Sequence, residues 1–159
     1  MGVDGDLYNL VLVLHLLAVI IGFGPTFIAG FYGKEAEKLP GREGLAVAQT
    51  TLNVTGRIPT AAVAAVPILG ILLILLSDDF WKFSEPWISI SFLLYIVLMG
   101  LATGVLVPTI RRMVAKRSGT EGAQSLEVQA MGKKVATISA IVNLLWVVIL
   151  FLMVFKPGH

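Results

Sequence analysis

Cysteine is absent from the chain of 159 residues, which excludes disulfides, iron–sulfur clusters and thiolate metal sites. Histidine is nearly absent, because His15 and His159 are the only two. Charge is scarce as well: 14% of the residues are charged and 57% are hydrophobic. This composition is far more apolar than a soluble domain requires. The chain also lacks a nucleophile–base arrangement and a phosphate-binding glycine loop, which disfavours an ordinary hydrolytic enzyme.

The few charges are missing altogether from four long segments. No Lys, Arg, Asp or Glu occurs in residues 7–33, 58–77, 87–110 and 135–155. A helix needs about 20 apolar residues to cross roughly 30 Å of hydrocarbon. The sequence therefore predicts an all-α fold in a single integral membrane domain over residues 1–159. The expected architecture is a transmembrane four-helix bundle with spans at about 7–32, 58–76, 87–110 and 135–155.

The distribution of basic residues predicts the orientation of these spans. Ten of the twelve Lys and Arg residues lie in the segments 33–57 and 111–134, whereas only Lys82 and Lys156 lie elsewhere. Loops rich in Lys and Arg stay in the cytoplasm. We therefore expect a multi-pass protein of the bacterial cytoplasmic (inner) membrane with both termini outside. This topology accounts for the basic loops without a nucleic-acid partner.

The two basic segments are rich in helix-forming residues. We expect cytoplasmic helical extensions before spans two and four, with turns near Gly41 and Ser118–Gly119. On the other side, the aromatic side chains of residues 80–87 are typical of an interfacial belt. An alternative is that Asp78, Asp79 and Glu85 bind a cation, although they show no defined ligand spacing.

Small residues and two prolines inside the spans predict how the helices pack. In lipid, helices associate through close contact of small residues, and we assign this packing role to Gly22, Gly100 and Gly104. Pro25 and Pro67 each free the carbonyl four residues earlier and bend the helix there. The bends could open a pocket or only adjust the packing, and both interpretations stay open.

Four side chains with polar tips are expected at a similar depth. His15 and Tyr95 are each eight residues in from the outer boundary of their span, which is about 12 Å at the rise of a helix. Trp146 is nearly level with them, and Asn143 lies one turn deeper. We therefore predict that His15, Tyr95, Asn143 and Trp146 converge and line a cofactor-binding site.

His15 has a structural and a functional interpretation. It could be a neutral residue that joins helices through a hydrogen bond to Tyr95 or Asn143. It could instead serve a cofactor, a metal or a proton path, because an ionisable residue inside a membrane is costly. The specific hypothesis is an axial ligand to haem iron. Since His159 lies in the outer tail, the site would be five-coordinate or would take its second ligand from another chain.

The segment LHLLAVIIGFGPTFIAG (residues 14–30) and the ending VVILFLMVFKPGH resemble small bacterial four-span membrane proteins. This superfamily includes the copper-resistance D family, the HemJ-type protoporphyrinogen oxidases and an uncharacterised group of predicted integral membrane proteins. Leu14-His15 and Lys156-Pro157 carry the likeness, which implies that His15 matches the haem histidine of the HemJ type. The Pro-Arg pair, the second histidine and a membrane-embedded lysine are missing here. The uncharacterised group is therefore the closer match.

Three functions are consistent with these features. The first is binding of haem or porphyrin through His15. The second is an accessory or scaffold subunit, as a homo-oligomer or in a larger membrane complex. The third is a small transporter, for which His15 would have to replace the intramembrane carboxylate that proton coupling generally needs. The lipid bilayer is the one partner common to all three.

Because the chain has no cysteine, single cysteines test the topology cleanly. We expect a cysteine at Asp79 to react with an impermeant thiol reagent from outside intact cells. A cysteine at Ser118 should react only after the membrane is opened. Labelling of the Ser118 position in intact cells would overturn the orientation.

Overall fold

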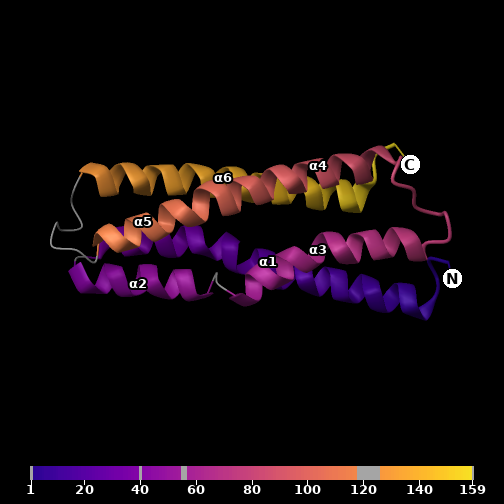
Figure 1. Cartoon of the computed structure of the whole chain (residues 1–159), viewed down its shortest axis with the longest axis horizontal. Coiled ribbons are helices and arrows are strands. Elements are labelled where there is room, and N and C mark those ends of the chain that lie inside the picture. Colours follow the sequence, from indigo (N-terminus) through magenta and orange to yellow (C-terminus); the bar gives the residue numbers. More distant parts are fainter. Residues whose placement is uncertain (1, 40, 55–56, 118–125, 159) are drawn as a thin grey trace.

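The computed structural model describes residues 2–39, 41–54, 57–117 and 126–158, and every regular element among them is helical. Six α-helices and one π-helix follow each other along the chain (Figure 1): α1 (Asp6–Lys38), α2 (Gly41–Val54), α3 (Arg57–Leu76), α4 (Pro86–Leu101), η1 (Ala102–Leu106), α5 (Val107–Arg117) and α6 (Leu126–Phe155). The expectation of an all-α fold is confirmed. The predicted turn at Ser118–Gly119 lies outside the described residues.

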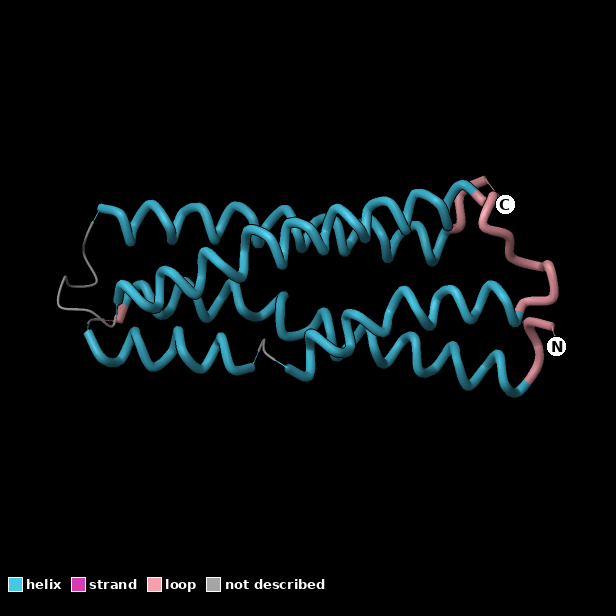
Figure 2. Tube along the Cα trace, in the orientation of Figure 1, coloured by secondary structure: helices cyan, strands magenta, loops and turns pink. Residues whose placement is uncertain are grey.

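The helices form four long rods. Helices α1 and α6 are each one rod, α2 is followed along one line by α3, and α4 continues through η1 into α5 (Figure 1). Helix α1 packs on α3 and α2, while α4 and α5 pack on α6. An ion pair between Lys116 of α5 and Glu127 of α6 joins the second pair of rods. Both ends of the chain and the 77–85 loop lie at one end of the bundle (Figure 2).

Three helical stretches are long and apolar enough to cross a membrane: Asp6–Tyr32, Pro86–Lys116 and Ala130–Phe155. The second predicted span corresponds to a shorter apolar helix, Ala61–Leu76. Length and composition thus support three spans, and the fourth stays a prediction. Helix α2 and the start of α6 occupy the segments for which the sequence predicted helical extensions.

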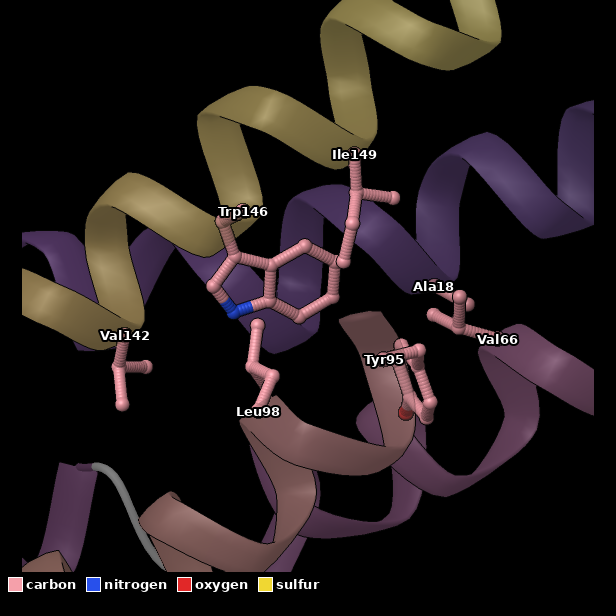
Figure 3. Packing of buried hydrophobic residues seen from close by; sticks show 7 residues of the cluster. All are labelled: Ala18, Val66, Tyr95, Leu98, Val142, Trp146 and Ile149. Atoms are coloured by element: carbon pink, nitrogen blue, oxygen red, sulfur yellow. The ribbon is translucent and has the colours of Figure 1, made fainter. Parts of the chain in front are cut away.

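The outside of the bundle is apolar. Ile20, Leu75, Ile96 and Phe31 are each 65–72% exposed. Soluble monomers rarely expose continuous apolar surface of this kind, whereas lipid-facing helices require it. The side chains inside come from all four rods: Figure 3 shows the central cluster, formed by Ala18, Val66, Tyr95, Leu98, Val142, Trp146 and Ile149.

Helices α1 and α3 come into close contact at Gly22. A Cβ atom added there would lie 2.7 Å from Val63 Cγ2, 3.1 Å from its backbone nitrogen and 3.3 Å from its Cα. Only a residue without a side chain allows the two backbones to come this near. Gly24, two residues further along α1, has no such neighbour within 4 Å. Gly22 therefore determines the distance between these two helices.

Replacement of Gly22 tests this contact. Gly22→Ala should lower the free energy of unfolding by about 1–3 kcal/mol, because an added methyl forces packed elements apart. Gly30→Ala is the matched control: Gly30 is on the same helix and has no neighbour within 4 Å, so the change should be neutral or slightly stabilising, since alanine favours the helix. Thermal unfolding of both variants in detergent makes the comparison. Equal melting temperatures would show that the contact does not limit the packing.

Candidate ligand cavity

Helices α1, α3, α4 and α6 line a cavity of about 280 Å³. The lining residues belong to the parts of these helices nearer the chain ends, whose position is marked in Figure 1. Most of its lining is apolar, including Leu12, Val19 and Leu73. The polar-tipped side chains are few, and they belong to Tyr8, His15, Trp81, Trp87, Ser91, Tyr95, Trp146 and Lys156. An apolar cavity with a few polar groups is the usual form of a small-molecule site.

His15 lines this cavity from α1 and lies against α3. A Cβ atom at Gly70 would be 3.5 Å from the Cε1 atom of the imidazole, which is ordinary contact. The Nδ1 atom is buried and has no hydrogen-bond partner among the described residues. The hydrogen bond to Tyr95 or Asn143 that the sequence suggested is not formed. His15 is therefore a half-buried residue beside the cavity. Its imidazole lies near the Val66 backbone of α3, and its Nδ1 atom makes no well-formed hydrogen bond among the described residues.

Tyr95 has a different partner, which Pro67 explains. The Tyr95 hydroxyl on α4 donates a hydrogen bond to the Val63 carbonyl on α3. Pro67 has no N–H, so it leaves that carbonyl without its helical donor. A bare carbonyl in hydrocarbon costs free energy, and the phenol supplies the missing donor from the neighbouring helix. Tyr95 thus joins α3 to α4 beside the cavity.

Trp146 and Asn143 lie on α6, but only Trp146 lines the cavity. Its ring centroid is 6.0 Å from that of Tyr95, at an edge-to-face angle of 84°, and 4.8 Å from that of Phe23. Figure 3 shows Trp146 and Tyr95 projecting from α6 and α4 into the same space. Asn143 is half-buried and outside the cavity lining. Of the four predicted cofactor-binding residues, the structure brings together His15, Tyr95 and Trp146.

The residues assigned to helix packing have different environments. Gly22 contacts α3 as described above, and Pro67 lines the cavity. Pro25 lies inside α1, which continues through it. A Cβ atom at Gly100 or Gly104 would meet nothing within 4 Å. Any close packing at these last two glycines would have to involve another molecule.

The mouth of the cavity, at the end of the bundle that holds the termini, is built from residues for which the sequence gave another interpretation. Trp81 and Trp87 pack edge to face with centroids 5.2 Å apart. The Trp81 indole N–H donates to the Tyr8 hydroxyl at 3.1 Å. The Lys156 Nζ atom lies 4.2 Å from the Trp81 ring centroid. The sequence suggests a membrane belt for the aromatic residues of the 80–87 segment. In the structure, two of them, Trp81 and Trp87, also line the cavity and lie near the Lys156 Nζ atom.

No group of three or more His, Asp or Glu side chains that could hold a metal ion occurs in the described part of the chain. For the suggested cation site at Asp78, Asp79 and Glu85, this means that the three carboxylates do not form such a group. Asp78 and Asp79 adopt left-handed backbone angles, with φ of 58° and 64°, as aspartate can in tight turns. Asp78 and Asp79 are thus turn residues of the 77–85 loop.

Residues 9–157 match the family described as predicted integral membrane protein (DUF2269). The chain belongs to this family. The match supports the membrane-protein assignment made from the sequence, and it does not extend to the copper-resistance D family or the HemJ type. No curated protein and no solved structure matches the chain.

A double-mutant cycle tests the bond between Tyr95 and the carbonyl freed by Pro67. Tyr95→Phe should lower the free energy of unfolding by about 0.6–2 kcal/mol, the usual range for a hydrogen bond between membrane helices. Pro67→Ala restores an N–H that can reach the Val63 carbonyl. In that background, Tyr95→Phe should cost much less.

Tyr32→Phe is the control, because Tyr32 is 54% exposed on α1. Its effect should be negligible and independent of Pro67→Ala. If Tyr95→Phe costs the same with and without Pro67→Ala, the two residues do not share the Val63 carbonyl.

Proposed function

We propose that this family member binds a small lipid-soluble molecule in the cavity between α1, α3, α4 and α6. The observation that carries the proposal is the unpaired, buried Nδ1 atom of His15 at the cavity wall. An unsatisfied buried polar atom costs about 1–3 kcal/mol. A ligand with a hydrogen-bonding group beside His15 would remove that cost, whereas an empty cavity leaves it in place.

The size and lining of the cavity limit the class of ligand. Pockets for small molecules span about 300–1,000 Å³, and this cavity of about 280 Å³ is just below that range. Its mainly apolar lining favours a molecule that partitions into the bilayer. We place the cavity in the outer half of the cytoplasmic membrane, in a four-span bundle with both termini outside. The distribution of Lys and Arg supports this topology, and the common end shared by the termini and the 77–85 loop agrees with it.

Haem is the specific ligand implied by the resemblance, with His15 as its axial ligand. The observation in its favour is that the imidazole lines the cavity with one nitrogen unpaired. Among the described residues, the cavity lining contains no second histidine and no carboxylate, and the cavity volume of about 280 Å³ is small for a porphyrin. We therefore rank a smaller ligand first. A Soret band in the gently purified protein that disappears in His15→Ala would reverse this order.

Association with another chain is the second candidate function, as a homo-oligomer or as an accessory subunit. The open positions at Gly100 and Gly104 favour it, because a neighbouring helix could approach α4 closely there. A transporter has no comparable observation in its favour, since the four apolar segments contain no Asp or Glu. Loss of an associated chain on Gly100→Leu, seen by chemical cross-linking in membranes, would support the accessory role.

Tryptophan fluorescence can report occupancy directly, because the chain has three tryptophans and all of them line the cavity. In nanodiscs, the neutral probe ω-bromoundecanol should quench this fluorescence in a saturable manner. Gly70→Leu should remove the saturable part, since a leucine on α3 would fill the space beside His15. Probe that is only dissolved in the bilayer also quenches the tryptophans, but that quenching increases with probe concentration without saturating.

Gly30→Leu is the matched control. It makes the same substitution on α1 at a position away from the cavity and with open space around it, so saturable quenching should persist. Quenching that never saturates, or that Gly70→Leu leaves unchanged, would refute ligand binding in this cavity.

A further inference from the structure

A lysine at the mouth of the cavity has an unusual backbone conformation. Helix α6 ends at Phe155, and the next residue, Lys156, has a φ of 45°. This left-handed conformation strains a residue with a side chain, and glycine usually occupies it at the end of a helix. A bond from the Lys156 N–H to the Leu152 carbonyl at 2.9 Å fixes the turn. The strained position brings the lysine side chain back over the cavity.

The ammonium group of Lys156 contacts aromatic rings rather than an acid. It lies 4.2 Å from the Trp81 centroid and 5.9 Å from the Trp87 centroid. Among the described residues, no carboxylate forms an ion pair with it. The side chain is half-buried and lines the cavity. A partly desolvated cation that has no ion-pair partner in the described part of the chain is a favourable partner for an anion.

A hydrogen-bond donor lies beside this cation. Trp87 is only 6% exposed, lines the cavity, and has a buried Nε1 atom without a hydrogen-bond partner in the described structure. The neighbouring Trp81 differs, since its N–H is already bonded to Tyr8. A ligand oxygen at the mouth could accept from Trp87 and interact with Lys156 together. This pair is the polar end of a cavity that is otherwise mainly apolar down to His15.

We propose that the ligand is a single-chain amphiphile with an anionic head, such as a carboxylate. Its head is bound by Lys156 and Trp87 at the outer mouth, and its hydrocarbon chain lies in the cavity. The modest volume of the cavity accommodates one chain rather than a two-chain lipid. This inference rests on the proposed function, because it specifies the ligand of the same cavity.

The test compares two probes that differ only in the head group. ω-Bromoundecanoate and ω-bromoundecanol have the same chain and the same quenching atom. In nanodiscs of neutral lipid, the wild-type protein should bind the carboxylate about tenfold more tightly, which is what a hydrogen bond to a charged group contributes. Saturable quenching of tryptophan fluorescence gives both dissociation constants.

Substitutions at Lys156 then assign the preference. Lys156→Met should reduce the ratio of the two constants to about one, while Lys156→Arg should keep most of it, because arginine retains the charge. Lys82→Met is the control: Lys82 is exposed in the 77–85 loop and does not line the cavity. It should leave the ratio unchanged. Far-UV circular dichroism and alcohol binding by each variant confirm that the bundle is intact.

The outcomes separate the two proposals. If neither probe quenches in a saturable manner, the cavity binds no such ligand and the proposed function fails. If both probes bind equally well to the wild type, the cavity binds ligands but the anionic head is refuted. A preference for the carboxylate that survives Lys156→Met, or that disappears equally in Lys82→Met, would overturn the assignment to Lys156.

Discussion

The hydrogen bond from Tyr95 to the Val63 carbonyl is the interaction on which the cavity depends. Pro67 deprives that carbonyl of its helical donor, and hydrocarbon offers no water to replace it. The Tyr95 hydroxyl supplies the donor across the gap between α3 and α4. This fixes the tyrosine ring against α3, with its O–H already donated. The Nδ1 atom of His15 lies at the cavity wall and has no hydrogen-bond partner among the described residues.

The close contact at Gly22 has a complementary effect. Helices α1 and α3 come together at Gly22 and Val63, and the cavity lies nearer the chain ends. There, a Cβ atom added at Gly70 of α3 would be in ordinary van der Waals contact with His15 of α1, and the missing side chain leaves room beside the imidazole. The same pair of helices thus has a close contact at one glycine and lines a cavity at another.

The cavity has two polar ends with different chemistry. At the deep end, His15 can donate or accept a hydrogen bond, depending on its tautomer. At the mouth, Lys156 and the Trp87 N–H provide only positive charge and a donor. Between them, the lining is mainly hydrocarbon. An amphiphile fits this distribution better than a uniformly apolar molecule does. The membership in a family of predicted integral membrane proteins places such a site where amphiphiles are concentrated.

The sequence by itself determined the helical class, the apolar segments and the depth at which polar side chains sit along each helix. These features follow from composition and from a fixed rise per residue, which are local properties of the chain. It therefore predicted that His15, Tyr95 and Trp146 would be at a similar level, and the structure places all three around one cavity. Depth along a helix says nothing about the direction in which a side chain points. Asn143 consequently lies outside the cavity lining, and Gly100 and Gly104 face open space. Only the tertiary structure decided which donor reached the Val63 carbonyl, because Tyr95 and Val63 are 32 residues apart. It alone also brought Lys156 over Trp81, since that contact depends on how the end of α6 turns back toward a loop 75 positions earlier.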